Sequence, residues 1–246
     1  MKAEKGIKKM YDNLAKEYHD KRRKKSPYNE YTEMPMTLKL LGNVKGKKIL
    51  DLGCGSGIYV KELIKKGAKI KAMDISSELI KIARQENPKI EFKIGSISKK
   101  LPYKKGEFDI VLGALVMHYI DNWTPAFKEI KRVLKPKGLF VFSTENPFRT
   151  AVKRIAYKGK KFKEVKNYFD EKLKVNKIKT PEGKNITIMR YRKTYETIMK
   201  YILINNFEII DYADAKPLLK AKKLFPTEYK KLNDFPYYCA WKLRKK

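Results

Sequence analysis

Cysteine and histidine are scarce in this chain, with only two residues of each type among 246. Cys54 and Cys239 lie far apart in the sequence, which argues against a disulfide framework and against a zinc site. No apolar run reaches the roughly 18 residues that a membrane span requires. Residues 1–9 are charged and hold no apolar segment of the kind found in secretory signals. These absences predict a cytoplasmic protein with no metal site and no membrane contact.

Acidic residues are also scarce, because 27 Asp and Glu stand against 59 Lys and Arg and leave a net charge of +32. The excess is uneven. Residues 149–193 hold 16 basic and 4 acidic residues, a net charge of +12, whereas residues 49–148 hold 18 and 11, a net charge of +7. A general bias towards solvated lysines would spread evenly, so the distribution favours an anionic substrate or a nucleic acid on one face. Both interpretations stay open at this point.

The middle of the chain alternates between predicted strands and predicted helices. Its hydrophobic fraction of 42% suffices for the core of one α/β domain with additions. The predicted strands cover residues 49–52, 69–73, 90–94, 108–112, 139–143, 208–212 and 237–243. The predicted helices of this part cover residues 58–66, 76–87, 123–134 and 195–204. Strands separated by helices are typical of a doubly wound, mostly parallel sheet.

Two segments do not follow this alternation. Residues 7–18 place apolar and aromatic side chains at helical spacing, and the five basic residues at 21–25 are expected to be exposed. Residues 149–193 are too long for an ordinary loop. The predicted division is an N-terminal helical lid at 1–45, an α/β core at 46–148, a basic cap insertion at 149–193 and a C-terminal completion of the core at 194–246.

A glycine-rich turn follows the first predicted strand. Gly53, Gly55 and Gly57 lie between that strand and a helix, where backbone N–H groups can approach a ligand closely. A dinucleotide fingerprint would read G-x-G-x-x-G, but Ile58 occupies the position of its last glycine. The turn therefore predicts a nucleoside-like ligand rather than a pyrophosphate.

Asp74 ends the second predicted strand, 17 residues after Gly57. Doubly wound sheets bind ligands at the carboxyl ends of their strands, and an acid at this place typically holds a ribose. A carboxylate can accept hydrogen bonds from both vicinal hydroxyls of that sugar. The alternative, in which Asp74 only caps the following helix, stays open.

The glycine turn preceded by Asp51, the acid Asp74, and the pairs Leu101-Pro102 and Phe108-Asp109 together resemble the class I S-adenosylmethionine-dependent methyltransferases. The resemblance implies a Rossmann-like, mostly parallel seven-stranded sheet that binds S-adenosylmethionine and releases S-adenosylhomocysteine. Ser96 stands where the family often has an acid that contacts the adenine. The candidate cofactor-binding residues are Asp51, Gly53, Cys54, Gly55, Gly57, Asp74, Ile75, Ser96, Ile97 and Leu115, together with Tyr18 of the N-terminal lid.

The stretch after the fourth predicted strand is similar to the family motif that lies beside the reacting methyl group. The resemblance makes His118 the candidate catalytic base, although a histidine that only packs or caps a helix is an open alternative. His19 is expected at the surface. Tyr11, Tyr18 and Tyr28 of the lid are candidates for closing over the cofactor, or for packing the lid on the sheet.

The leading hypothesis is therefore a methyltransferase that moves a methyl group by in-line displacement to a small or medium-sized acceptor. The net positive charge of the chain is compatible with an anionic acceptor. The main alternative is an RNA methyltransferase whose basic insertion grips phosphates. A protein that binds the cofactor without turnover and an NAD(P)-dependent oxidoreductase are the remaining alternatives. The sequence names neither the acceptor nor the oligomeric state.

Overall fold

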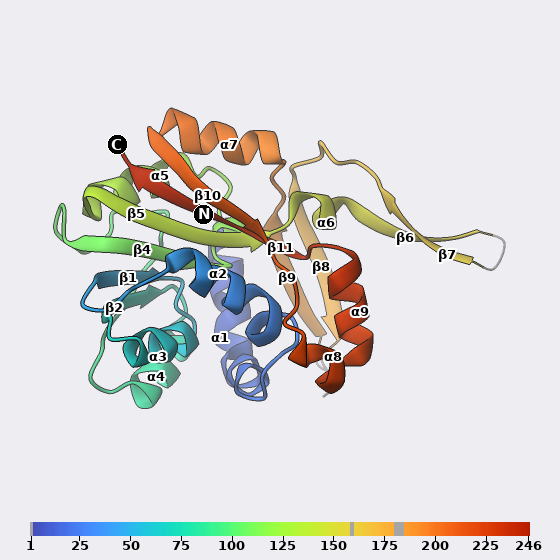
Figure 1. Cartoon of the computed structure of the whole chain (residues 1–246), viewed down its shortest axis with the longest axis horizontal. Coiled ribbons are helices and arrows are strands. Elements are labelled where there is room, and N and C mark those ends of the chain that lie inside the picture. The colour runs from blue at the N-terminus through green and yellow to red at the C-terminus, as the bar shows by residue number, and fades with distance from the viewer. Residues whose placement is uncertain (1, 158–159, 180–184) are drawn as a thin grey trace.

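The computed structural model describes residues 2–157, 160–179 and 185–246. Its centre is a seven-stranded sheet in the order β10-β11-β5-β4-β1-β2-β3 (Figure 1). The four pairings among β1 to β5 are parallel, whereas β11 is antiparallel to both of its neighbours. The doubly wound, mostly parallel fold is thus confirmed. The strands are β1 (Lys48–Leu52), β2 (Lys69–Asp74), β3 (Glu91–Ile94), β4 (Phe108–Ala114), β5 (Leu134–Glu145), β10 (Phe207–Asp214) and β11 (Tyr238–Lys245).

The order of the strands places a crevice between β1 and β4. From β1 the chain runs outward through β2 and β3, and then crosses back to add β4 on the other side of β1. Strands that lead away in opposite directions leave a crevice at their carboxyl ends. Asp51 in β1, Asp74 at the end of β2 and Glu145 at the end of β5 therefore come to the same edge of the sheet.

Helices cover both faces of the sheet. α2 (Met34–Leu41), α3 (Ile58–Lys65) and α4 (Ser77–Glu86) pack on one face, and α5 (Thr124–Val133) and α7 (Tyr195–Ile204) pack on the other. Aromatic rings dominate the second face, where the fully buried Trp123 stacks on Phe127 and meets Phe142 edge-on. These layers exclude water from both sides of the central strands, which suits the near-continuous apolar runs of β1 and β4.

The predicted strands and helices of the core are confirmed, with ends that differ mostly by one or two residues. The exception is β5, which begins at Leu134 rather than at residue 139. The backbone is already extended at Leu134, the residue directly after α5, so the strand starts without an intervening loop.

The N-terminal helix α1 (Lys2–Arg23) is longer than the predicted helix, because it continues into the basic run. The expectation that this whole run is exposed is wrong for Arg22, which is 7% exposed. Arg22 lies four residues after Tyr18 and so shares its inner helix face. The expectation of a surface position is also wrong for His19, which is buried with its Nε2 3.6 Å from Glu86 Oε1.

Short helical elements join these parts. Three of them lie near the carboxyl edge of the sheet: the π-helix η1 (Asn29–Glu33), the 3-10 helix η2 (Met117–Tyr119) and α6 (Pro147–Ala151). Two further helices, α8 (Lys220–Leu224) and α9 (Pro226–Asp234), lie between β10 and β11 in the chain. The sequence did not predict these two, because few apolar residues mark their periodicity.

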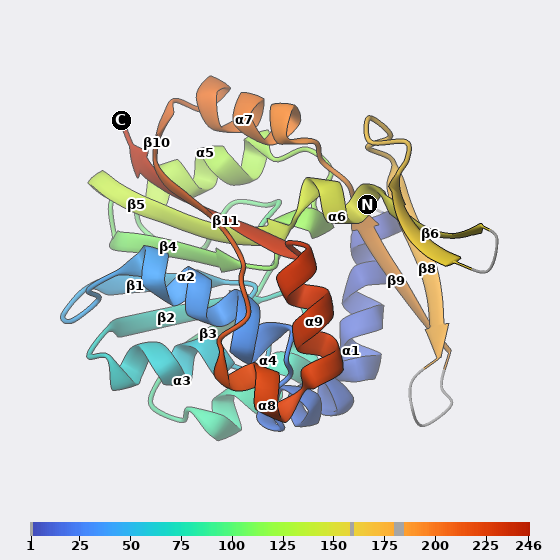
Figure 2. The same cartoon turned by 45° about the vertical axis from the view of Figure 1, so that its right-hand side comes forward.

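The segment predicted as a basic cap insertion forms two hairpins, β6 (Val152–Tyr157) with β7 (Lys160–Val165), and β8 (Leu173–Lys179) with β9 (Asn185–Tyr191). Its residues 158–159 and 180–184 lie outside the described residues. The first hairpin extends away from the sheet, and the second lies beside α1 (Figures 1 and 2). β9 packs against both α1 and η2. Among the described residues, no helix combines the length and apolarity needed to cross a membrane.

Candidate active site

A cavity of about 260 Å³ lies at the carboxyl ends of β1, β2, β4 and β5. The chain contributes walls to it from three distant regions, namely the strand ends, helix α1 and strand β9. α1 supplies Tyr11, Tyr18 and Arg22, and β9 supplies Arg190. Because α1 precedes the sheet in the sequence and β9 lies between β5 and β10, the cavity exists only once both segments have folded over the sheet edge.

The cavity gathers nearly all of the residues predicted for the site. Gly57 is the exception, since it does not line the cavity but begins α3 in a left-handed conformation with φ +80°. The predicted residues that line it are Tyr18, Asp51, Gly53, Cys54, Gly55, Asp74, Ile75, Ser96, Ile97, Leu115 and His118.

The glycine turn needs glycine for two separate reasons. Gly53 and Gly55 have φ values of +72° and +55°, which L side chains rarely adopt. A Cβ on Gly53 would also lie 2.8 Å from the Cβ of Val116, and one on Gly55 would lie 3.3 Å from the Tyr18 ring. The turn is therefore packed between the loop after β4 and helix α1, and the Gly53 and Gly55 N–H groups donate within the protein, to the Met73 carbonyl and to Asp74 Oδ2.

Asp74 is held by the backbone on both of its oxygens. Oδ2 accepts the Gly55 N–H at 2.9 Å, and Oδ1 accepts the Ser76 N–H at 2.9 Å. Burial raises the pKa of Asp74 above its ordinary value, although these backbone hydrogen bonds partly oppose the shift. The residue that caps α4 is Ser76, whose hydroxyl accepts the Leu79 N–H at 3.2 Å. Asp74 is therefore not the cap of α4, although it braces the glycine turn and the residue before α4 through these two N–H groups, and its role toward a ribose stays a prediction.

Three buried polar atoms along the cavity wall have no hydrogen-bond partner among the described residues: Asp51 Oδ2, Ser56 Oγ and Arg22 Nη2. Buried polar atoms are nearly always paired, so unpaired ones beside a cavity indicate a polar ligand. The set contains a cationic donor and a carboxylate, which fit the carboxylate and the ammonium of an amino acid. The residues thus suit the methionyl end of S-adenosylmethionine, beside an acid suited to its ribose.

Of the two ionisable groups, Arg22 already carries the charge that such a zwitterion needs, whereas Asp51 is mostly protonated at pH 7. Burial, together with the nearby charges of Asp74 and Glu33, raises the pKa of Asp51 to about 8. Arg22 is fixed in place by two contacts, from Nε to Glu30 Oε1 at 2.5 Å and from Nη1 to the Tyr18 hydroxyl at 2.9 Å. These two contacts hold the guanidinium in one position and leave its third nitrogen, Nη2, available to a ligand.

A buried carboxylate on η1 ties the wall of the cavity together. Glu33 is fully buried and accepts hydrogen bonds from the Ser143 hydroxyl at 2.6 Å, the Tyr59 hydroxyl at 2.9 Å and the Thr37 hydroxyl at 2.9 Å. Ser143 Oγ in turn accepts the Leu115 N–H at 3.0 Å. Leu115 has φ +52°, a strained conformation for a leucine. The network thus stabilises the strained turn that brings Leu115 to the cavity.

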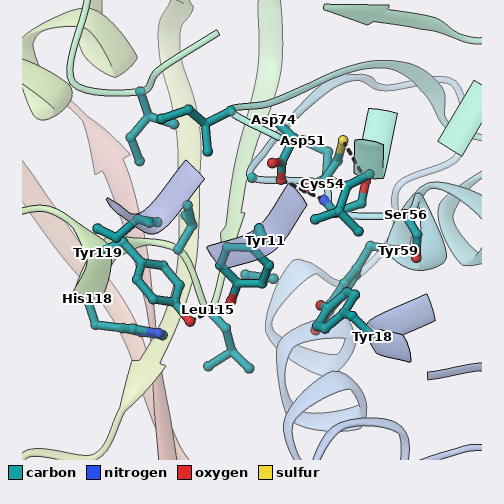
Figure 3. Close-up of a pocket in the computed structure, with 18 of the residues that line it drawn as sticks. Tyr11, Tyr18, Asp51, Cys54, Ser56, Tyr59, Asp74, Leu115, His118 and Tyr119 are labelled. Carbon is teal, nitrogen blue, oxygen red and sulfur yellow. Dashed lines mark hydrogen bonds between the residues drawn. The ribbon is translucent and has the colours of Figure 1, made fainter. Parts of the chain in front are cut away.

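The far end of the cavity carries aromatic and charged groups. Figure 3 shows His118 and Tyr119 across the cavity from Asp51, Cys54 and Asp74, with Tyr11 between the two groups. The hydroxyls of Tyr11 and Tyr119 lie 2.5 Å apart. Two further charged residues line this end, where Arg190 Nη1 donates to Glu145 Oε1.

His118 is neutral at ordinary pH. Its ring is buried, with Nδ1 3.5 Å from the Thr144 hydroxyl, and burial together with the charge of Arg190 lowers its pKa from 6.5 to about 3. A neutral imidazole can accept a hydrogen bond or a proton, although such a low pKa makes it a weak base. Whether His118 takes part in catalysis stays a prediction.

The pKa of His118 predicts a measurable effect on stability. Between about pH 6.5 and 3 the unfolded chain protonates this histidine and the folded chain does not, so the stability that depends on His118 falls as the pH falls. Between pH 7 and pH 5 this loss is expected to reach about 1–2 kcal/mol. In urea titrations, His118→Asn should flatten the pH dependence over that interval and leave it parallel to the wild type above pH 7. Parallel curves throughout would contradict the lowered pKa.

Sequence reasoning missed several residues of the cavity wall, among them the charged residues Arg22, Glu33, Glu145 and Arg190. Only Arg22 carried a usable signal, because its spacing of four residues from Tyr18 continues the inner face of the predicted helix. The others come from separate segments, and nothing local marks them as neighbours.

Comparison with known proteins agrees with this geometry. Residues 50–142 match the family model described as a methyltransferase domain. A Haemophilus influenzae protein of undescribed function is 29% identical over 249 residues, covering 95% of each chain. The ubiquinone biosynthesis O-methyltransferase of Nitrosococcus oceani is 28% identical, over 55% of this chain and 60% of its own. The structure of an S-adenosylmethionine-dependent methyltransferase from Mesorhizobium loti superposes with a TM-score of 0.71 at 23% identity, covering 86% of this chain and 97% of that one.

The chain belongs to the class I S-adenosylmethionine-dependent methyltransferases. It is an enzyme of that class, and S-adenosylmethionine is its cofactor.

Proposed function

We propose that the enzyme methylates a small or medium-sized acceptor that binds in the cavity between α1, β9 and the strand ends. The observation that supports this proposal is the continuity of the cavity, which runs from the glycine turn to His118, Tyr119 and Arg190. A partly enclosed cavity with aromatic walls suits a compact acceptor better than a flat surface would.

In this proposal the wall near the glycine turn holds the cofactor. Asp74 accepts hydrogen bonds from the ribose hydroxyls, and the free arm of Arg22 binds the carboxylate of the methionyl end. Asp51, whose pKa of about 8 leaves it mostly neutral at pH 7, ionises beside the ammonium group. Ser96 and Ile97 line the cavity beyond Asp74 and contact the adenine.

The opposite wall orients the acceptor. S-adenosylmethionine would supply a methyl group on a positively charged sulfur: a nucleophile of the acceptor attacks that carbon, the C–S bond breaks, and S-adenosylhomocysteine leaves with the electron pair. The work of the chain is then alignment and the exclusion of water. Neutral His118 accepts a hydrogen bond from the attacking group, and Arg190 offers a positive charge to an acidic substituent. The O-methyltransferase relative supports oxygen as the attacked atom.

Calorimetry combined with a turnover assay tests this function. S-adenosylhomocysteine and S-adenosylmethionine should both bind, and NAD should not, because the turn lacks the spacing for a pyrophosphate. Formation of S-adenosylhomocysteine is then followed with a panel of small hydroxylated and carboxylated acceptors. Binding of NAD in place of the adenosyl compounds would contradict the proposal. Tight cofactor binding with no turnover on any acceptor would favour a binding protein.

An RNA acceptor is the second candidate. It is favoured by the net charge of +12 over residues 149–193 and by the hairpin β6–β7, which extends from the body of the protein (Figure 1). Phosphate contacts make RNA affinity fall steeply with salt. Gel shifts with structured RNA at low and at physiological salt should show that steep dependence if RNA is the substrate. No binding at low salt would exclude it.

A further inference from the structure

Helix α1 covers the cavity along much of its length, and its attachment to the core governs access to the site. Its residues Ile7, Tyr11, Tyr18 and Arg22 are part of the cavity wall. The helix packs against α4 on one side and β9 on the other. Few of its apolar side chains are fully buried, chiefly those of Ile7, Met10 and Ala15. Because α1 buries so few apolar side chains, polar contacts are needed to hold it over the cavity.

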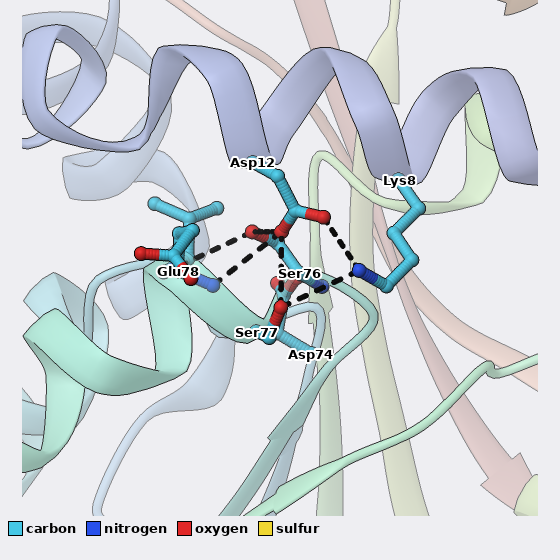
Figure 4. Close-up of polar contacts among 7 residues, drawn as sticks. Lys8, Asp12, Asp74, Ser76, Ser77 and Glu78 are labelled. Atoms are coloured by element: carbon cyan, nitrogen blue, oxygen red, sulfur yellow. Dashed lines mark hydrogen bonds and ion pairs between the residues drawn. The ribbon is translucent and has the colours of Figure 1, made fainter.

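One group of polar contacts is centred on Asp12, which faces the start of α4 (Figure 4). Asp12 Oδ1 accepts a hydrogen bond from the Ser76 hydroxyl at 2.7 Å, and longer ones from the Ser77 hydroxyl at 3.5 Å and the Glu78 N–H at 3.4 Å. Its other oxygen, Oδ2, accepts from Lys8 Nζ at 2.5 Å. A carboxylate at a helix N-terminus also gains from the positive end of the helix dipole.

Asp12 stays ionised while it makes these contacts. Partial burial by itself would raise its pKa, but the hydrogen bonds from Lys8, Ser76 and the Glu78 amide hold the pKa below its ordinary value. The charge is therefore present throughout the neutral pH range.

The contacts of Asp12 lead directly to the ribose-binding acid. Ser76 uses its hydroxyl to bind Asp12 and its N–H to bind Asp74 Oδ1. One residue thus joins the covering helix to the turn that holds Asp74. The hydrogen bond from Ser76 to Asp12 therefore also restrains the turn at Asp74. Helix α1 can move away from the cavity only if that hydrogen bond breaks.

We propose that Asp12 is a positioning residue, which through Ser76 couples the closure of α1 to the ribose-binding turn and so slows the release of bound cofactor and product. This inference rests on the proposed cofactor site. Lid opening often limits the release of product in enzymes whose sites are covered. Here the controlling contact lies outside the cavity, because Asp12 and Lys8 do not line it.

The test is the dissociation rate of S-adenosylhomocysteine, measured by surface plasmon resonance on the full chain. Asp12→Asn keeps the shape of the side chain and removes its charge, and should raise the dissociation rate about tenfold, the size expected for one charged hydrogen bond. Asp20→Asn is the matched control, since it makes the same change on the same helix at an exposed position. The control should release the ligand at the wild-type rate.

A double-mutant cycle separates coupling from a general loss of stability. Ser76→Ala and Asp12→Asn remove the two ends of one hydrogen bond, so the double variant should release the ligand little faster than the faster single variant. Effects that multiply would overturn the coupling. An unchanged rate in Asp12→Asn, or an equal rise in Asp20→Asn, would overturn the role of Asp12 in a protein whose cofactor site is intact. A wild type that does not bind S-adenosylhomocysteine would overturn the site and this inference together.

Hydrogen exchange of the wild type gives a measurement that needs no variant. Addition of S-adenosylhomocysteine should slow exchange in α1 and at the amides of residues 76–79 together, because one contact links them. Protection of residues 76–79 without any change in α1 would overturn the proposal.

Discussion

Asp74→Ala is expected to weaken the binding of S-adenosylhomocysteine by about 1–3 kcal/mol, because charged hydrogen bonds to the ribose are lost. At 25 °C this loss corresponds to roughly a 5- to 150-fold rise in the dissociation constant. The variant also frees the Gly55 and Ser76 N–H groups that the carboxylate binds, which loosens the turn itself. Calorimetry measures the change directly.

The controls for this substitution follow from the environment of Asp74. Asp234→Ala changes an exposed acid at the end of α9 and should bind the ligand as the wild type does. The pKa of Asp74 is raised by burial, so acidification should protonate it at a pH above the ordinary value of 3.8. In the wild type, affinity for S-adenosylhomocysteine should therefore decrease as the pH is lowered, and in Asp74→Ala it should decrease much less. Unchanged affinity of the variant at pH 7 would refute the ribose role.

Gly53→Ala is expected to reduce cofactor affinity by roughly 5- to 150-fold, the equivalent of the 1–3 kcal/mol that overpacking typically costs. The new Cβ would need a φ of +72° and would overlap Val116, a stiff, β-branched side chain. Either the glycine turn or the loop after β4 must then move, and both line the cavity. The dissociation constant of S-adenosylhomocysteine is the measurement.

Two further variants show whether the overlap or the backbone conformation causes the loss. Gly46→Ala places the same residue at a φ of +73° where nothing lies within 4 Å, so it tests backbone strain without a collision. It should lower stability by about 1 kcal/mol and leave affinity unchanged. Gly53→Ala combined with Val116→Ala removes the collision and should recover part of the affinity. An equal loss in Gly46→Ala, or no recovery in the double variant, would contradict the packing explanation.

The core was predictable because its signals are local. The turn at Gly53–Gly57 joins one strand to the next helix, and Asp74 ends the neighbouring strand, so both could be placed from apolar runs alone. In a doubly wound sheet, parallel strand ends meet at one edge, which brings these residues together without further information. The cofactor class came from the resemblance of these residues to the methyltransferase family, and the comparisons with known proteins confirm it.

The surroundings of the site were less predictable, because burial depends on packing that the local sequence does not record. A run of five basic residues suggested exposure throughout, yet Arg22 is turned inward beside Tyr18 and Glu30. Glu33 appears as an unremarkable acid in the sequence, yet three hydroxyls from two helices and a strand surround it. Tyr28 was a candidate to cover the cofactor, but its ring packs against Tyr237 instead and does not line the cavity.

The sequence by itself determined the sheet, the cofactor and the position of Asp51 and Asp74, since each depends on residues close together in the chain. Only the tertiary structure decided which residues close the site. Arg22, Tyr119 and Arg190 come from segments far apart in sequence, and they meet because α1 and β9 fold over the same edge of the sheet. Long-range packing of this kind leaves no periodic signal, because each partner contributes one side chain and the contact exists only after both segments have folded.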